Sequence, residues 1–341
     1  MLKDRKKQTA AVFVFALIYI LVFILSFAIG RYPVNPWTMI KILVSRIIPI
    51  EQTWTNQEAI VVLNIRLPRL LAATLVGAGL SLAGLVFQTI FHNPMVSPDV
   101  LGTTSGAGFG AALALLLGLN GLMVNAVAFL FGILSILLVW LIASKVRHNQ
   151  VLGFVLGGIM ISSLFSSLTS FVKLVADPND TLPSITYFLM GSLAGCTKED
   201  VLMSLFPIAI GVVVILLFSW RINILSLSEE EARSLGVNTH FIRIVVIIAS
   251  ALIISTAVSI SGVIGWIGLV IPHVVRMLIG CDTRKTMPSS LFLGGAFLII
   301  VDTISRAATT SEIPIGILTA IIGAPFFLYL IIREGRREDA F

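Results

Sequence analysis

Long apolar stretches separated by short polar segments dominate the chain. Ten stretches are long enough to cross a hydrocarbon core of about 30 Å as helices. They lie at about 11–30, 67–89, 98–118, 121–143, 151–173, 200–219, 241–261, 263–280, 289–308 and 314–332. The least certain boundary separates the seventh from the eighth, where only Gly262, Gly265 and Pro272 interrupt the run. The pattern predicts an all-α, polytopic membrane protein of about ten helices, in a single domain spanning residues 1–341.

Composition and charge agree with this class and give an orientation. Hydrophobic residues make up 57% of the chain, charged residues 12%, and the mean hydropathy is +1.03. An average soluble domain has roughly 25% charged residues. Placing both termini in the cytoplasm puts most of the 23 Lys and Arg residues inside. The first apolar run is long and lacks a signal-peptidase site, so it is interpreted as a retained anchor. Cys196 and Cys281 then fall at opposite membrane faces and do not pair.

The segment from Arg66 to Gly110 is the most informative part of the chain. Two arginines precede a glycine-rich apolar run, which His92, Asn93 and Pro94 interrupt before a second small-residue run begins. Small residues let helix backbones approach closely in lipid. A proline break at membrane depth requires water or protein to satisfy the freed backbone groups. The segment is therefore predicted to be a membrane hairpin that lines a pathway, and the glycines from Gly102 to Gly110 to serve helix packing.

Three shorter features complete the predicted organisation. Asn35 and Pro36 mark the start of a short helix lying in the membrane interface. The outer segment 176–183 is expected to be a loop that ends at a proline. A weak inverted repeat pairs residues 79–90 with residues 257–268, matching Ser81 to Ser259 and Gly84 to Gly262. Such repeats are common in transporters, although two identities in small-residue segments also arise by chance.

The sequence offers little enzymatic chemistry. It has no G-x-x-x-x-G-K-[ST] motif, no H-E-x-x-H motif and no evident pair of nucleophile and base. We therefore predict no catalytic residue, no metal site and no cofactor, and the basic net charge reflects membrane topology rather than nucleic-acid binding. Asp302 is the one acidic residue placed well inside an apolar run, and a local ion pair with Arg306, four residues later, is its simplest explanation.

An acidic cytoplasmic segment, residues 225–238, is predicted to form a short exposed helix. Ser228 caps a first turn rich in glutamate, and Gly236 ends the helix. A short capped helix between two membrane spans is suited to docking another protein, although it could also be a simple connector.

Four ordered motifs resemble the permease subunits of type II ABC importers, which take up iron-siderophore complexes, haem, vitamin B12 or molybdate. These motifs are the run that begins RLPRLLAATLVGAG, then EEEARSLGVN, then SGVIGWIGLVIPHVVRMLIG, and finally EIPIG with IGAPF. Ile313 and Trp266 depart from the residues common in the family without weakening the resemblance. The resemblance implies a ten-helix permease of the bacterial inner membrane, most simply one for an iron-siderophore complex.

The resemblance also implies partners and site residues. A second copy of the chain or a homologous permease would complete the translocation path. Two separate ATPase subunits would dock below, and an extracytoplasmic substrate-binding protein above. The binding protein would meet the outer arginines Arg66, Arg69 and Arg306. Asn93, Met95, His148 and Asn149 would form the cytoplasmic gate. Coupling to the ATPase would use Glu230, Glu231, Ala232 and Gly236 in a segment at about 226–239.

An alternative class is an ion-coupled secondary carrier that works without partners. Such carriers usually bury functional acidic or histidine residues in mid-membrane. His92, His148, His240 and His273 are scattered and lie mostly near the predicted inner face. The scarcity of buried charge therefore favours a transport path powered by a separate ATPase.

Overall fold

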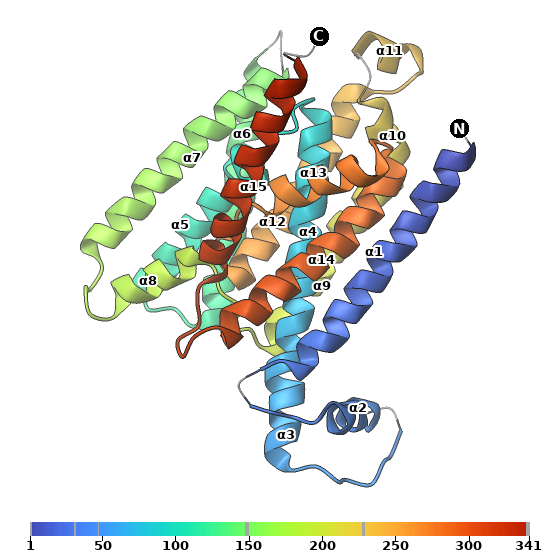
Figure 1. Cartoon of the computed structure of the whole chain (residues 1–341). Helices are drawn as coiled ribbons and strands as arrows, with labels where there is room; N and C mark the ends of the chain where they lie inside the picture. Colours follow the sequence, from blue (N-terminus) through green and yellow to red (C-terminus); the bar gives the residue numbers. More distant parts are fainter. Residues whose placement is uncertain (1, 31, 47, 147–149, 227–228, 339–341) are drawn as a thin grey trace.

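The computed structural model describes residues 2–30, 32–46, 48–146, 150–226 and 229–338, and every regular element in these residues is helical (Figure 1). In chain order the elements are α1 Leu2–Ala28, α2 Pro36–Val44, α3 Asn56–Ile60, the π-helical η1 Val61–Arg66, α4 Leu67–Ile90, the 3-10 helix η2 Pro98–Leu101, α5 Thr103–Leu116, α6 Gly121–Lys145, α7 Gln150–Val175, α8 Thr181–Met190, α9 Lys198–Leu217, α10 Ser219–Ile224, α11 Glu229–Ser234, α12 Thr239–Ser261, α13 Ile267–Ile279, α14 Thr283–Ala307 and α15 Ile315–Glu338.

The predicted membrane spans are confirmed. Within the described residues, seven helices are long and apolar enough to cross a membrane, and three shorter apolar helices, Thr103–Leu116, Ile267–Ile279 and Ile315–Tyr329, match the remaining predictions. The helices form a bundle with two distinct ends (Figure 1). We call the end that carries both chain termini, α10 and α11 the terminal end, and the end that carries α2 and α3 the loop end.

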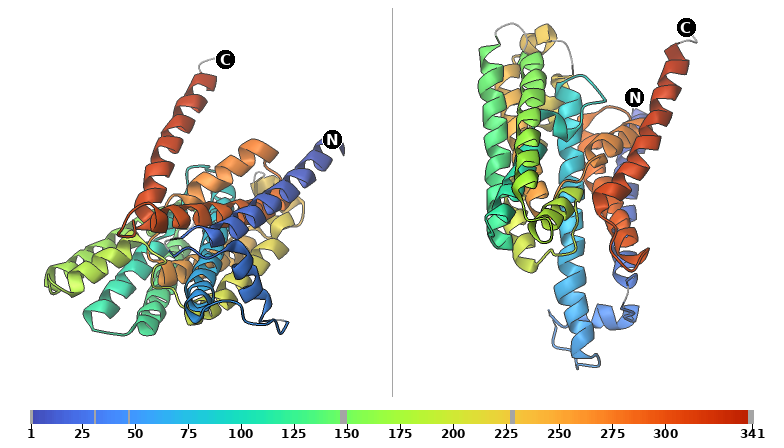
Figure 2. Two further views of the ribbon diagram at one scale, coloured as in Figure 1. Left: turned by 60° about the horizontal axis from the view of Figure 1, so that its bottom comes forward. Right: turned by 90° about the vertical axis from the view of Figure 1, so that its left-hand side faces the viewer.

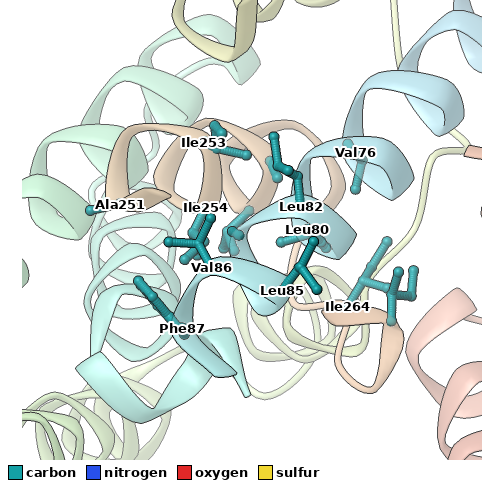
Figure 3. Packing of buried hydrophobic residues seen from close by; sticks show 14 of the residues in the cluster. Val76, Leu80, Leu82, Leu85, Val86, Phe87, Ala251, Ile253, Ile254 and Ile264 are labelled. Carbon is teal, nitrogen blue, oxygen red and sulfur yellow. The ribbon is translucent and has the colours of Figure 1, made fainter. Parts of the chain in front are cut away.

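Helix α4 passes through the middle of the bundle and packs against α12, α13 and α14. Figure 3 shows its apolar side chains, among them Val86 and Phe87, beside Ile253 and Ile254 of α12. Small residues on α4 allow still closer backbone contacts. A Cβ at Gly84 would lie 2.5 Å from the carbonyl carbon of Gly268 in α13. Close packing of this kind drives helix association in lipid, where apolar burial contributes little.

The central helix begins earlier than the sequence suggested. The arginines near Leu67 were expected at a helix start, but a continuous helical segment runs from Asn56 to Ile90. Thr55 and Glu58 form a capping box at its true beginning. The turn before Leu67 is π-helical, and the Leu67 amide donates to the Val62 carbonyl. Arg66 and Arg69 therefore lie well inside a helix.

Other local expectations have mixed outcomes. The Asn35 side chain accepts a hydrogen bond from the Trp37 amide at 2.9 Å, which confirms the predicted start of α2. The expected loop at 176–183 is wrong in its second half, because α8 begins at Thr181 and includes Pro183. Proline is tolerated in a first helical turn, where the backbone N–H groups have no intrahelical partner.

The boundary between the seventh and eighth spans lies at Gly262 and Gly265, two of the three residues that the sequence suggested. Helix α12 ends at Ser261, Gly262 follows with φ +65°, and α13 begins at Ile267, so Pro272 lies inside a helix. Gly84 lies mid-helix in α4, whereas its partner in the suggested repeat, Gly262, ends a helix. The two segments of that repeat therefore differ in local structure.

Helix α15 stands apart from the rest of the bundle toward its C-terminal end, as both views in Figure 2 show. Its first turn is anchored, because the Ile315 amide donates to the Gly191 carbonyl at 2.8 Å. Gly316 lies against the Met190 carbonyl, where a Cβ would not fit. The helix is thus fixed at the loop end and separated from the bundle at the terminal end.

Candidate functional site

The outer arginines form an internal charge cluster at the loop end. The Arg69 Nε atom donates to Asp302 Oδ1 at 2.8 Å, and its Nη1 atom donates to Glu312 Oε1 at 3.0 Å. Arg306 Nε lies 3.7 Å from Asp302 Oδ2. Asp302 is fully buried, whereas the Glu312 side chain keeps 24% of its surface exposed. Asp302 therefore pairs mainly with Arg69 of α4, rather than only with its helical neighbour Arg306.

Arg66 and Arg306 hold the end of α1. Arg66 Nη1 donates to the Phe27 carbonyl, and Arg306 Nη2 donates to the Ser26 carbonyl at 2.6 Å. Both carbonyls lie in the last turn of α1, where backbone oxygens have no intrahelical N–H partner. The arginines supply these partners, so the cluster joins the ends of α1, α4 and α14.

The three arginines predicted to dock a binding protein are buried within this chain. Arg66, Arg69 and Arg306 are only 3%, 5% and 8% exposed. The guanidinium groups of Arg69 and Arg306 contact carboxylates of the same chain, and that of Arg66 contacts backbone carbonyls. A partner at the loop end would meet the neighbouring polar surface, including part of Glu312, before it met these arginines.

The predicted gate segment forms a tight turn at the terminal end of α4. The Asn93 amide donates to the Gln88 carbonyl at 3.2 Å, and the His92 amide donates to the Thr89 carbonyl at 3.3 Å. This is the Schellman arrangement, with His92 rather than glycine in the left-handed position at φ 50°. The Asn93 side chain accepts from the Met95 amide at 2.9 Å, and Met95 is 49% exposed. We call residues 91–95 the gate turn; His148 and Asn149 lie outside the described residues.

The predicted acidic helix is present as α11, Glu229–Ser234. Gly236 follows it with φ +74°, and the Val237 amide donates to the Ala232 carbonyl at 3.2 Å, as expected for a glycine cap. Ala232 is buried, while Glu231 and Leu235 are exposed. Glu230 lies in the same helix, and the proposed cap residue, Ser228, lies outside the described residues. The segment therefore presents a short, capped helix at the terminal end.

A cavity of about 620 Å³ opens at the loop end, among the first turns of α6 and α9, α8 and the end of α12. Asn125 and Asp200, which line it, form a hydrogen bond of 2.7 Å. Cys196 also lines this cavity. Among the described residues, no group of three or more His, Cys, Asp or Glu side chains is arranged to hold a metal ion.

The two cysteines should differ sharply in reactivity. Burial, together with the nearby Asp200 carboxylate, raises the pKa of the Cys196 thiol to about 12, from a usual 9.0. A raised pKa leaves on the order of a thousandfold less thiolate at any pH below 9. In single-cysteine variants of opened membranes, exposed Cys281 should react with maleimide much faster than Cys196, whose rate should keep rising above pH 9. Equal rates at pH 8 would contradict the raised pKa of the Cys196 thiol.

Sequence reasoning missed three polar features of this architecture. Asp99 lies in η2, in a segment that had been interpreted as part of an apolar run. Glu312 provides the second carboxylate for Arg69. Gln88 is 4% exposed and contacts α13. A search for every polar residue within apolar runs would have selected Asp99 and Gln88, because buried polar groups in membrane helices need specific partners.

Comparisons with known proteins give a consistent result. A model of the FecCD transport family matches residues 17–333. The molybdate import system permease protein MolB of Haemophilus influenzae is 40% identical over 94% of this chain and 96% of that protein. The Fe(3+) dicitrate transport system permease protein FecC of Escherichia coli is 37% identical over 83% and 86%. A solved metal-chelate type ABC transporter in an inward-facing conformation has a TM-score of 0.84 at 38% identity, covering 94% of this chain and 98% of that chain.

In the residues that the structure describes, seven long and three shorter apolar helices form the bundle of a polytopic membrane protein. The chain belongs to the FecCD transport family, whose members are permease subunits of ABC importers. It is accordingly a multi-pass protein of the cytoplasmic membrane.

Proposed function

We propose that this permease carries a metal chelate into the cell, with ATP hydrolysed by separate subunits docked at α11. The observation that carries this proposal is the position of α11, a short capped helix with exposed Glu231 and Leu235 at the same end of the bundle as the gate turn. In this arrangement the terminal end faces the cytoplasm. An exposed leucine on a rigid, glycine-capped helix fits an apolar groove on a partner protein.

The transport path would lie between this subunit and a second copy or a homologous permease. The exposed face of α7 carries hydroxyl groups, at Ser163, Ser167 and Ser170, each of which donates to a carbonyl of its own helix. Such a face is weakly polar and has no charge to trap a cargo. Asp302 is held by Arg69, so it does not supply the ionisable relay that a secondary carrier would need.

A substrate-binding protein would dock at the loop end. The charge cluster of Arg66, Arg69 and Arg306 would support this docking indirectly. It fixes the ends of α1, α4 and α14 and, through Glu312, the connection to α15. The arginines are therefore proposed as positioning residues for the docking surface rather than as its exposed charges.

An iron chelate is the proposed cargo, with molybdate as the second candidate. Both proposals rest on relatives: an iron dicitrate permease from Escherichia coli and a molybdate permease from Haemophilus influenzae, of which the second is matched over 96% of its length. An uncharged path suits a large chelate, whose selection the binding protein would perform.

Uptake by the complete importer in proteoliposomes tests this proposal. Ferric siderophores, ferric dicitrate, haemin, cobalamin and molybdate are offered in turn, with and without ATP inside. We expect ATP-dependent uptake of a ferric chelate.

The variant that tests coupling is Gly236→Val, because a β-branched residue is strongly disfavoured at φ +74°. It should lose uptake by about tenfold or more together with ATPase co-purification. Uptake of molybdate alone would replace the iron proposal, and unchanged ATPase co-purification and uptake by Gly236→Val would remove α11 from coupling.

A further inference from the structure

Gln88 supplies a hydrogen bond that the backbone of α13 lacks. Pro272 lies inside that helix and has no N–H group to offer the Gly268 carbonyl one turn earlier. The Gln88 Nε2 atom donates to this carbonyl at 3.2 Å and lies 3.3 Å from the Leu269 carbonyl. A side chain of α4 thus satisfies a backbone group of α13 that would otherwise be buried and unbonded.

The same glutamine is held from its other side. Arg276, one turn beyond Pro272 on α13, donates from Nη2 to the Gln88 Oε1 atom. Both ends of the Gln88 amide therefore bind α13, next to the close backbone contact between Gly84 and Gly268. With donor and acceptor both engaged, the amide has one favoured orientation, and α4 cannot slide along α13 without breaking these bonds.

Gln88 is also part of the gate turn. Its backbone carbonyl accepts the hydrogen bond from the Asn93 amide that closes the Schellman arrangement. The residue that fixes the gate turn through its main chain consequently fixes α4 to α13 through its side chain. A displacement of α13 would therefore be transmitted directly to the gate turn.

A second set of hydrogen bonds connects α10, which precedes α11 in the chain, to the start of α14, which follows α13 after a short turn. Helix α13 ends at Ile279, and α14 begins at Thr283. The Thr283 amide and hydroxyl each lie 3.2 Å from Asn223 Oδ1, and the hydroxyl donates to the Ser219 carbonyl at 2.9 Å. Thr283 is buried. Because the Thr283 amide is in the first turn of α14, it has no intrahelical partner, and Asn223 of α10 supplies one.

We propose that Gln88 and Asn223 are positioning residues that transmit movement of α11 to the gate turn. The route starts at α10, which precedes α11 in the chain, and passes through Asn223 to Thr283 at the start of α14. It then follows the short turn back to α13 and continues through Arg276 to Gln88 and residues 91–95. Figure 1 places α10 and α11 together at the terminal end of the bundle. The inference rests on the proposed function, in which α11 docks the ATPase. It adds the route by which docking reaches the gate.

Cross-linking of the gate turn between two permease copies tests the route. The background is Met95→Cys combined with Cys196→Ser and Cys281→Ser, in membranes that also contain the ATPase subunits. A bismaleimide is added without nucleotide, or with ATP and vanadate. In this background we expect the cross-linking yield to change by about fivefold with nucleotide. Gln88→Leu and Asn223→Ala should each reduce the change to less than about twofold. ATPase co-purification should be retained.

Two further variants separate transmission from folding. Thr256→Val removes a buried hydroxyl that donates to the Leu252 carbonyl of its own helix, α12, and should keep the full nucleotide response. The double variant of Gln88 and Asn223 should be no worse than either single one, because both act in one route. If Gln88→Leu does not accumulate, Asn223→Ala decides the question.

The outcomes distinguish the inference from the function on which it rests. A full nucleotide response in both Gln88→Leu and Asn223→Ala would overturn the route and leave the gate intact. Additive losses in the double variant would also overturn it. A background that shows no nucleotide response, or no ATPase co-purification, would overturn the proposed gate or docking helix, and the route with it.

Discussion

Replacing Asp302 by alanine is expected to prevent the permease from accumulating in its folded form. The carboxylate is fully buried, and Arg69 Nε lies 2.8 Å from it. Its removal leaves Arg69 with Glu312 in place of two carboxylate partners and removes the carboxylate beside Arg306. Breaking one side of a buried ion pair costs about 3–5 kcal/mol, which is a large share of a total stability of about 5–15 kcal/mol.

Yield and thermal stability in detergent measure this effect. Asp180→Ala is the matched control, because it removes the same group at the same end of the bundle from an exposed position, where a change within about 0.5 kcal/mol is expected. Asp302→Asn should lie between the two, since it keeps an acceptor for Arg69 but loses the charge. Wild-type yield and melting temperature in Asp302→Ala would show that the cluster does not stabilise the fold.

This expectation also revises the consequence of reversing the outer arginines. Exposed docking charges would tolerate reversal to glutamate and weaken only the partner complex. Buried arginines would not. Reversal of Arg69 or Arg306 places a glutamate beside Asp302, and reversal of Arg66 removes the donor to the Phe27 carbonyl and buries a carboxylate there. A loss of binding-protein association in such variants is therefore informative only alongside a measurement of folding.

Features that depend on residues close together in the chain were predicted well from the sequence. The spans follow from apolar length alone, which is a local property. The capped helix α11 was also predictable, because Gly236 and the preceding glutamates act within a few residues of each other. The partners of Arg69 come from residues 302 and 312, and those of Arg66 from the end of α1. One sequence contains no signal for such distant pairings, so the arginines were interpreted as charges that meet a partner protein.

Gln88 and α8 were missed for different physical reasons. The structural role of Gln88 depends on Pro272, which lies far along the chain. The glutamine side chain replaces a hydrogen bond that the proline removes. Helix α8 was hidden by Pro183, which was taken as the end of a loop. The same residue is compatible with a first helical turn, so a proline alone does not distinguish a loop from the start of a helix.

Substituting leucine for Gly84 is expected to have the second large effect, by separating α4 from α13. A Cβ at this position would lie 2.5 Å from the carbonyl carbon and 2.6 Å from the α-carbon of Gly268. The obstacle is backbone, which cannot change rotamer, so the helices must move apart. Overpacking of this kind typically costs about 1–3 kcal/mol, and the bonds from Gln88 to α13, one turn further along α4, would lengthen with it.

The matched control is Gly121→Ala, at the start of α6, where a Cβ would meet nothing within 4 Å. Alanine favours a helix over glycine by about 1 kcal/mol, so this variant should be as stable as the wild type or more so. Gly84→Leu should lower the melting temperature of the purified permease. It should also weaken the nucleotide response of the gate cross-link, because the same movement separates Gln88 from Gly268. A Gly84→Leu variant with the melting temperature and the gate response of the wild type would show that α4 and α13 do not need this close approach.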